Sequence, residues 1–351
     1  MASKHHDDIS QWPFISVIVP VRNEAASIER TLECLMTQDY DPPQWEVLVV
    51  DGHSDDATAD LARRFAERHP ALRVLRNPRR LSSAARNIGI RNARANADIV
   101  LIVDGHCEIE DTHYLRKLAA AFARSGADCV GRPQPLATRD PTPLQRAVAA
   151  ARSSWLGHHP HSHVYSSQSG AVPAASVAVA YRRSVFDRVG WFDEHFDACE
   201  DVEFNHRIDR AGLRCYFAPE VAVRYAPRAS LSGLLFQMMR YGRGRLRLLR
   251  KHPATLSLGS LLPLLFTVGL GVGLPLGFAA HWLAAAYLAA VVCYAAIVLV
   301  VSARIAWRLR DGRLLVRLPL VFVTVHLGVG IGMLLELVSP GRRWRAGVTP
   351  S

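Results

Sequence analysis

The sequence predicts an α/β domain with a mostly parallel sheet, followed by about three transmembrane helices. In the first two thirds of the chain, short runs of Val, Ile and Leu alternate with helical patterns, as in a parallel sheet covered by helices on both faces. In the last third, no Asp, Glu, Lys or Arg occurs between His252 and Ala303, and a second charge-free run extends from Leu318 to Leu335. A spanning helix needs about 20 apolar residues, so the first run can hold two spans and the second run one.

The distribution of charge excludes a general nucleic-acid-binding protein. The 351 residues have a formal net charge of +11, yet residues 1–239 contain 28 Lys and Arg against 29 Asp and Glu. Residues 240–351 contain 14 basic side chains and only two acidic ones, Asp311 and Glu336. A nucleic-acid-binding module carries its basic surface on the folded domain itself, whereas here the basic excess surrounds the apolar runs. We therefore expect a membrane partner and no nucleic acid.

The N-terminal domain is expected over residues 14–230, after a polar tail at 1–13. Strands are predicted at Ile15–Val19, Glu46–Val50, Arg73–Leu75, Ile99–Val103 and Cys129–Gly131. Helices between them are predicted at Ala25–Thr37, Asp55–Arg68, Ser82–Ala95 and Thr112–Ser125. After a proline-rich loop, the pattern predicts a helix at Leu144–Trp155, a strand at Val177–Ala180, and helices at Ser184–Val189 and Asp201–Ala211.

The last third divides into a basic amphipathic interface segment at 231–252, a transmembrane region at 253–340 and a basic tail at 341–351. Spans are expected near Leu256–Phe278, Leu283–Ala303 and Leu318–Val338. Basic clusters precede the first and third spans, so the positive-inside rule places the N-terminal domain in the cytoplasm, at the cytoplasmic (inner) membrane. Three spans leave the basic tail outside, against the same rule, unless one segment is re-entrant.

Neither a cleavable signal peptide nor a disulfide framework is expected. The N-terminus, MASKHHDDIS, lacks the apolar segment of a signal peptide. The six cysteines form no Cys-x-x-Cys pair, and thiols of a cytoplasmic domain stay reduced.

Three predicted strands end in polar residues, and ligands of parallel sheets bind outside the carboxyl ends of the strands. Asp104 and His106 end the fourth strand. Residues i and i+2 of an extended chain project to the same side, so this carboxylate and imidazole can converge on a divalent cation. The alternative is a strand-end aspartate that caps the next turn.

The first two strands end in candidates for nucleotide binding. Asp51 can accept from the N–H of a nucleobase, or it can cap the following helix. The segment from Pro20 to Glu24 can wrap a base and ribose, or it can simply begin a helix. None of these features is diagnostic alone.

Two further segments carry candidate chemistry. Glu200 and Asp201 begin a predicted helix, where paired acids act as caps or as a general base within reach of an acceptor hydroxyl. Gln237, Arg240 and Tyr241 lie on the basic segment before the first span. They can face lipid headgroups, face the site, or do both from different sides of the helix.

A polar stretch contains four histidines, His158, His159, His161 and His163. We interpret it as a mobile loop over an acceptor channel, not as a metal site. The surrounding residues are Ser, Gly and Pro, and no predicted element would hold the rings in ligand geometry.

Taken together, these pieces resemble glycosyltransferase family 2 of the GT-A fold over residues 14–240. The stretches that carry the resemblance are ISVIVPVRNEAASIERTL, VLVVDGHSDDAT, SAARNIGI, IVLIVDGHCEIE and VGWFDEHFDACEDVEFNHRI. The later QMMRYGRGR, followed by apolar runs, is most similar to the membrane-anchored branch that contains succinoglycan-type glucosyltransferases. The resemblance implies a GT-A nucleotide-sugar-binding domain.

The resemblance also implies how the donor is bound. Pro20, Glu24, Asp51 and Asp104 would bind the nucleotide-sugar, with Glu24 and Asp51 at the uridine. Asp104 and His106 stand where the family has its D-x-D metal motif, so a divalent cation, Mn²⁺ or Mg²⁺, is the expected cofactor. An imidazole in place of the second carboxylate favours Mn²⁺.

On the acceptor side, the resemblance makes Asp201 the catalytic base. Glu200 would lie beside the acceptor or the diphosphate. Gln237, Arg240 and Tyr241 match the family's Q-x-x-R-W element, with Tyr in place of Trp, and would contact the acceptor or diphosphate near the bilayer.

The implied activity is the inverting transfer of a sugar from a nucleotide-sugar, expected to be a UDP-hexose such as UDP-glucose, onto a lipid-linked saccharide in exopolysaccharide or cell-surface glycan synthesis. Other polysaccharide-assembly proteins are partners that the resemblance leaves open. Two enzymatic alternatives are transfer to polyprenyl phosphate and processive synthesis of a β-glycan. A non-enzymatic alternative is a silent nucleotide-sugar-binding membrane scaffold, but the presence of Asp51, Asp104 and Asp201 in one chain argues against it.

Overall fold

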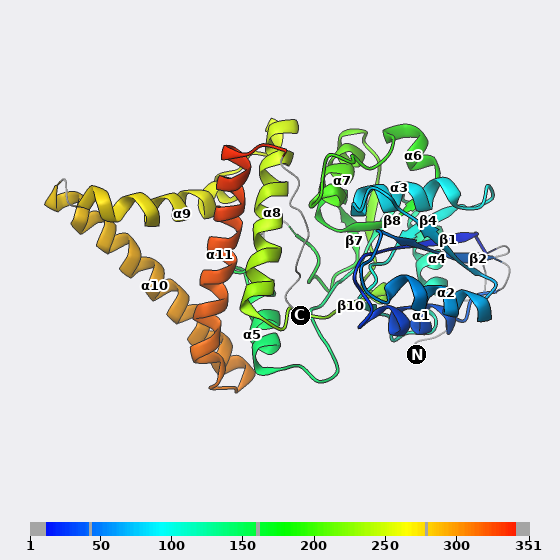
Figure 1. Ribbon diagram of the computed structural model, residues 1–351, viewed down its shortest axis with the longest axis horizontal. Helices are drawn as coiled ribbons and strands as arrows, with labels where there is room; N and C mark the ends of the chain where they lie inside the picture. The colour runs from blue at the N-terminus through cyan, green and yellow to red at the C-terminus, as the bar shows by residue number, and fades with distance from the viewer. Residues whose placement is uncertain (1–11, 42–43, 159–161, 278–279, 342–351) are drawn as a thin grey trace. The chain divides into compact units, whose positions relative to one another are not determined.

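The structure, a computed structural model, describes residues 12–41, 44–158, 162–277 and 280–341. The chain divides into two compact units, one formed by 1–135 with 161–226 and the other by 136–160 with 227–351. The first unit contains the β-sheet, and the second contains the long apolar helices (Figure 1).

The first unit is built on an eight-stranded sheet in the order β3-β2-β1-β4-β8-β6-β9-β7. Its strands are β1 (Ile15–Val21), β2 (Trp45–Asp51), β3 (Leu72–Arg76), β4 (Ile99–Ile102), β6 (Cys129–Gly131), β7 (Gly170–Val172), β8 (Ala178–Arg182) and β9 (Cys215–Phe217). A two-stranded sheet pairs β5 (Cys107–Glu108) with β10 (Arg224–Tyr225). The predicted alternation of strands and helices is therefore present in the N-terminal domain.

One half of the large sheet is parallel, as the sequence predicts. Strands β3, β2, β1 and β4 pair in parallel, and every residue of β1, β2 and β4 is buried. Their continuous Val, Ile and Leu runs fit this position, because helices cover both faces of such strands.

The other half of the sheet is mixed. β8 lies antiparallel between β4 and β6, and β7 lies antiparallel to β9. Of these strands, the sequence pattern indicates only β6 and β8. β7 and β9, with three residues each, are not among the predicted strands.

Helices cover the sheet in two layers (Figure 1). One layer consists of α1 (Ile28–Met36), α2 (Thr58–Arg68) and α4 (Tyr114–Ser125), and it packs on Ile15, Val17 and Val19 of β1. The other consists of α3 (Ser82–Asn92), α6 (Ser184–Val189) and α7 (Glu200–Arg210), and it packs on Ile18. Successive residues of β1 thus alternate between two cores, as the pleat requires.

The second unit is helical. It contains α5 (Pro143–Arg152), α8 (Leu231–Lys251), α9 (Leu258–Gly277), α10 (His281–Leu309) and α11 (Leu314–Val338). The hydrophobic core of this unit is formed by residues of α5, α8, α10 and α11, and α8 lies beside α11 in Figure 1.

Two helices in the described part of the chain, α10 and α11, are long and apolar enough to cross a membrane. Of the about three expected transmembrane helices, two are therefore confirmed as long and apolar enough to span a membrane. α9 covers the remaining predicted span, but its qualifying apolar stretch, Leu258–Gly273, is shorter, and Pro263 and Pro275 lie within the helix. The two long apolar helices suggest that the protein is anchored in a membrane.

Some sequence-based expectations fall on residues outside the described ranges. These are the polar tail before Trp12, the basic tail after Gly341, and His159 and His161 of the histidine-rich stretch. His163 is described, and its Nδ1 lies 3.1 Å from Ser176 Oγ. All six cysteines are described and free, as expected for reduced thiols.

Candidate active site

Three neighbouring strands bring the predicted donor-binding residues to one edge of the sheet. Val21, at the end of β1, pairs with Asp51, at the end of β2. On the other side of β1, Ile18 pairs with Ile102, two residues before Asp104. The polar strand ends therefore lie side by side at the carboxyl edge, where parallel sheets bind ligands.

The loops that follow β1 and β2 are joined by hydrogen bonds. The backbone N–H of Asn23 donates to Ser54 Oγ at 3.0 Å, and that of Glu24 donates to Thr58 Oγ1 at 2.7 Å. In return, the N–H of Asp55 donates to Asn23 Oδ1 at 2.8 Å. The two loops therefore form one surface beside Glu24 and Asp51.

Three of the five described non-glycine residues with a positive φ adjoin candidate residues. Asn23, His53 and Cys199 have φ values of 56°, 61° and 60°, in the left-handed region that side chains other than glycine rarely adopt. They precede Glu24, follow Asp51-Gly52, and precede Glu200, respectively. Each such residue costs on the order of 1–3 kcal/mol, and residues of this kind cluster at functional sites.

Asp51 both caps its loop and faces the edge of the sheet. Its Oδ1 accepts from Ser54 Oγ at 2.5 Å, and both carboxylate oxygens lie 3.3 Å from the backbone N of Ser54. The residue is only 7% exposed. Asp51 does not cap α2, which begins at Thr58 and has no side-chain cap. Its contacts with Ser54 lie in the loop before that helix, and they orient the carboxylate.

The Asp104-Gly105-His106 loop is supported by the start of α1. The hydroxyls of Ser27 and Thr31 each donate to the carbonyl of Gly105 at 3.0 Å. Gly105 itself has no room for a side chain, because a Cβ there would lie 2.6 Å from Val21 Cγ1. These contacts fix the backbone between the two predicted metal ligands.

His106 bonds to a second predicted site residue. Its Nδ1 lies 2.9 Å from Glu24 Oε1, and its ring packs edge-on against Tyr225 with centroids 5.0 Å apart. A Nδ1–H donated to a carboxylate leaves the lone pair on Nε2, which is how a protein usually prepares a metal-binding histidine. The residues at this loop fit a divalent cation in that respect, although no group of three His, Cys, Asp or Glu side chains is arranged to hold one among the residues described.

Arg86 on α3 is a site residue that the sequence reasoning did not single out. Its Nη2 lies 3.3 Å from Glu200 Oε1 and 3.8 Å from Asp104 Oδ1, and its guanidinium lies over the Phe192 ring. Burial acts to lower the pKa of Arg86, but Glu200, Asp104 and Asp201 outweigh it and hold that pKa above its usual value. A permanent cation therefore joins a strand end to the start of α7.

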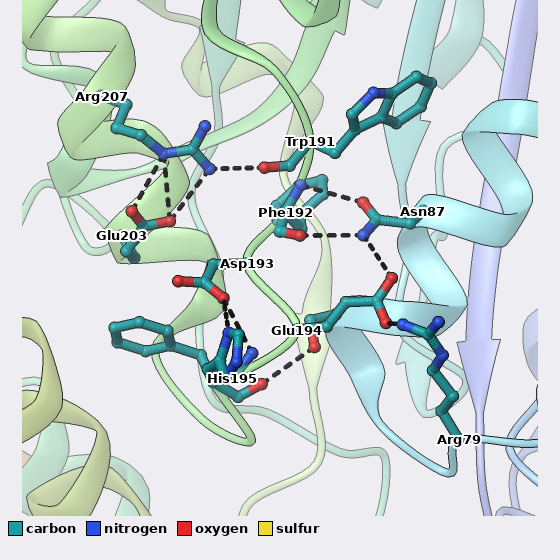
Figure 2. Close-up of polar contacts among 11 residues, drawn as sticks. Arg79, Asn87, Trp191, Phe192, Asp193, Glu194, His195, Glu203 and Arg207 are labelled. Atoms are coloured by element: carbon teal, nitrogen blue, oxygen red, sulfur yellow. Dashed lines mark hydrogen bonds and ion pairs between the residues drawn. The ribbon is translucent and has the colours of Figure 1, made fainter.

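The same face of α3 holds the loop that leads into α7 (Figure 2). Asn87 Nδ2 donates to the carbonyl of Phe192 and to Glu194 Oε1, both at 2.9 Å, and the N–H of Phe192 donates back to Asn87 Oδ1 at 3.0 Å. Glu194 also pairs with Arg79. Ser83 and Asn87 are polar side chains four residues apart on one buried face of α3, and Arg86 lies between them. This pattern is the signal in the sequence that could have revealed the contact.

A second anchor of this loop comes from α7 itself. Arg207 donates to both carboxylate oxygens of the fully buried Glu203 and to the carbonyl of Trp191 (Figure 2). It also donates to the carbonyl of Val189. The beginning of the loop that leads to Glu200 and Asp201 is therefore held both by α3 and by α7.

Asp201 lies in an unusual electrostatic environment. Its surface is open to solvent on one side, yet desolvation by the surrounding protein raises its pKa, and the neighbouring Glu200 carboxylate raises it further. Arg86 acts in the opposite direction without cancelling these effects. Asp201 is thus a carboxylate with a pKa above that of an ordinary aspartate.

The remaining candidates, Gln237, Arg240 and Tyr241, belong to α8 in the second unit. Arg240 and Tyr241 are exposed, whereas the neighbouring Met238 and Gly242 are buried. Two arginines of the same basic segment, Arg243 and Arg247, pair with Glu336 of α11. In a helix that lies on lipid, all basic side chains would face outward. In this segment at least two of them face α11 instead.

The structure combines a mixed sheet, four strands of which are parallel, with carboxylates at the strand ends. Arg86 joins one of these carboxylates to the acidic start of α7. These features define a glycosyltransferase of the GT-A class. Residues 13–244 match the family described as glycosyltransferase like family 2. The chain belongs to this family.

Two relatives and one solved structure show how far the similarity extends. The chain is 34% identical over 251 residues to the succinoglycan biosynthesis protein ExoA of Rhizobium meliloti, covering 71% of this chain and 74% of that protein. It is 30% identical over 239 residues to the glycosyltransferase AglE of Haloferax volcanii, covering 68% and 75%. The mannosyltransferase PcManGT of Pyrobaculum calidifontis, solved with GDP-Man and Mn²⁺, shares the fold with a TM-score of 0.57 and 23% identity, over 93% of this chain and 88% of that one.

Proposed function

We propose that the protein transfers a hexose from a UDP-sugar, such as UDP-glucose, to a lipid-linked saccharide with inversion at the anomeric carbon. The observation that carries the proposal is the link through Arg86 between Asp104 at a strand end and Glu200 beside Asp201. Arg86 thereby connects the edge of the sheet that is suited to bind a nucleotide-sugar with Asp201, the carboxylate that is suited to act as a base. The name of the relative ExoA supports a role in exopolysaccharide or other cell-surface glycan synthesis.

Donor binding is assigned to the three strand ends. Asp51, oriented by Ser54, accepts a hydrogen bond from the uracil N–H, and the segment from Pro20 to Glu24 lies along the base and ribose. The hydrogen bonds between the two loops support this assignment, because they hold both walls of the binding surface in place before the donor arrives.

Asp201 is assigned the role of general base. The acceptor hydroxyl loses its proton to the Asp201 carboxylate as its oxygen attacks the anomeric carbon. The bond from that carbon to the diphosphate breaks on the opposite face, and UDP leaves with the electron pair. The raised pKa supports this role, because a base works best with a pKa close to the operating pH.

Asp104 and His106 are assigned to a divalent cation, Mn²⁺ or Mg²⁺. Such an ion neutralises charge that develops on the leaving diphosphate. The contact from Glu24 to His106 supports the assignment, because it orients the ring and places a proton on Nδ1. PcManGT, which shares the fold, was solved with Mn²⁺.

The acceptor is assigned to the membrane. Basic residues precede the long apolar helices and favour a cytoplasmic position for the catalytic domain at the inner membrane. Gln237, Arg240 and Tyr241 contact the acceptor or its diphosphate, and anchoring raises the effective concentration of a lipid-linked acceptor.

The test uses membranes that contain the full-length protein and a panel of radiolabelled nucleotide-sugars. We expect label from a UDP-hexose in the lipid fraction, bound to a saccharide, and no such label with Asp201→Asn. Label found only on polyprenyl phosphate would show that polyprenyl phosphate, and not a lipid-linked saccharide, is the acceptor. A labelled polymer that grows with time would indicate a processive synthase. Donor binding without any transfer would support the silent scaffold and refute the proposal.

A further inference from the structure

The second unit contains a buried ion cluster that the proposed function does not use. Glu336 of α11 is 1% exposed. Its Oε2 accepts from Arg243 Nε and Arg247 Nη2, both at 3.0 Å, and its Oε1 accepts from Arg247 Nε at 2.9 Å. The backbone N–H of Gly341 adds a bond to Oε1 at 3.0 Å, so the carboxylate is fully engaged.

The cluster also holds the end of α11. Arg250 donates to the carbonyl of Glu336 at 3.1 Å, and Arg243 Nη2 lies 3.4 Å from the carbonyl of Ser339. The last carbonyls of a helix have no partner within the helix, so arginines from α8 supply one here. One side of α8 is thus attached to both the side chain and the backbone of the end of α11.

On the N-terminal side of this cluster in each helix, α8 and α11 touch through glycine. A Cβ at Gly242 would overlap the carbonyl oxygen of Val329, and a Cβ at Gly332 would overlap that of Met239. A Cβ at Gly328 would lie 2.6 Å from Met238 Cβ. Glycines let the backbones approach closely, but they offer no polar group that would set the rotation of one helix against the other.

The glycine contact with α11 and the predicted acceptor residues lie on different sides of α8. At about 100° per residue, Gln237, Arg240 and Tyr241 fall within one sector of α8, and Met238 and Gly242 fall outside it. Arg243 and Arg247, which pair with Glu336, lie beside Arg240 at the border of that sector. The exposure of Arg240 and Tyr241 agrees with this arrangement. Rotation of α8 on α11 would therefore change where all three acceptor residues point.

We propose that Glu336 is a positioning residue for Gln237, Arg240 and Tyr241. By holding Arg243 and Arg247 it sets the rotation and the axial register of α8 on α11, and so fixes the direction in which the three residues face. The inference rests on the proposed function, because the acceptor role of α8 is part of that proposal. Glu336 is the only acid between residues 314 and 338, so neither arginine has a substitute carboxylate on α11.

The first test replaces Glu336 by Gln in the full-length protein and measures transfer in membranes. The neutral amide weakens the hold on both arginines, so α8 no longer keeps one orientation. We expect kcat/KM to fall by about tenfold to 10²-fold, the cost of a misplaced binding group. The loss should appear in the KM of the lipid-linked acceptor, and the KM of the UDP-sugar should not change. Arg245→Gln is the control: it removes one charge from α8, at an arginine with no ion pair to Glu336, and should leave both constants unchanged.

A charge exchange tests the pairing itself. Glu336→Arg alone should be more harmful than Glu336→Gln, because it adds a further cation beside Arg243, Arg247 and Arg250. Adding Arg247→Glu restores one buried carboxylate among the cations, and it should recover much of the acceptor KM. If Glu336→Gln prevents folding, Arg247→Lys keeps the charge but loses the two-nitrogen contact, and it should raise the acceptor KM by a smaller factor.

Limited trypsin digestion supplies a readout that needs no enzyme activity. In the wild type, Arg243 and Arg247 should resist cleavage, and Glu336→Gln should open both sites. Cleavage and acceptor KM equal to those of Arg245→Gln would overturn the inference, and so would a charge exchange that recovers nothing. If the wild type transfers no sugar, the proposed function fails, whereas trypsin cleavage at Arg243 in the wild type, in Glu336→Gln and in the charge-exchange variant still reports whether Glu336 holds α8.

Discussion

The guanidinium of Arg86 lies 3.3 Å from the Glu200 carboxylate, so residues more than 100 positions apart in the sequence form one buried ion pair. Arg86 is 8% exposed and Glu200 is 6% exposed. Because Asp104 also lies near Arg86, the strand end that carries Asp104 and the helix start that carries Asp201 are held by the same cation.

Replacing Arg86 by Gln should destabilise the protein and lower turnover. The change leaves Glu200 buried without its cation, and breaking a buried ion pair costs about 3–5 kcal/mol of the free energy of unfolding. Thermal unfolding and transfer assays measure the two effects. Arg91→Gln, on the same helix, removes an arginine that stacks on Trp191 and should cost less than about 1 kcal/mol. Equal Tm values for the two variants would contradict the prediction.

Replacing Asp201 by Asn should lower turnover by about 10²–10⁴-fold while leaving donor affinity unchanged. The amide has nearly the same size as the carboxylate but cannot take a proton from the acceptor hydroxyl. Asp187→Asn, an exposed acid on α6, serves as the control and should retain full activity. Near-normal turnover of the Asp201 variant would move the role of base to another residue.

The pH dependence of kcat/KM should respond to Glu200. Asp201 must be ionised to act as a base, so activity falls as the pH drops through its pKa, and the raised pKa places that fall above the range of an ordinary aspartate. Glu200→Gln removes a neighbouring negative charge and should lower the pKa of Asp201. The acid limb of the profile should therefore move to lower pH. A shift to higher pH would mean that Asp201 is not the group responsible.

Transfer should require a divalent cation held at Asp104 and His106. Chelation should abolish activity, and Mn²⁺ should restore at least as much as Mg²⁺. His106→Asp should shift the preference toward Mg²⁺, because carboxylates suit this ion better than imidazole does. The ratio of the half-activating concentrations of the two ions measures the shift, and full activity in excess chelator would refute the prediction.

Replacing Gly242 by Ala should destabilise the contact between α8 and α11. The added methyl group overlaps the carbonyl oxygen of Val329, and overpacking of this kind costs about 1–3 kcal/mol. Gly269→Ala is a matched change in α9, where a Cβ meets nothing within 4 Å. It should leave stability unchanged or raise it by up to about 1 kcal/mol, because Ala favours helices. A comparison of Tm values in detergent tests both expectations.

Local pattern in the sequence was enough to predict the parallel half of the sheet and its polar edge. Strands covered on both faces must be apolar throughout, and their ends must become polar where they reach the ligand side. Val21 and Asp51 therefore lie where the sequence predicts them, with Asp104 close by on the neighbouring strand. The apolar helices α10 and α11 were predictable for a similar reason, because a charge-free stretch of about 20 apolar residues is typical of a transmembrane helix.

Contacts between distant residues depend on the tertiary structure. Periodicity indicates which face of a helix is buried, but it does not indicate which residue lies opposite. The polar face of α3 is visible in the sequence, but the partner of Arg86, Glu200, is identified only once α3 lies beside the start of α7. Likewise Arg243 and Arg247 have the sequence pattern of a helix on a lipid surface, yet their carboxylate partner, Glu336, lies about 90 residues further along the chain. The free energy of a buried charge depends on that partner, and only the packing of α8 on α11 supplies it.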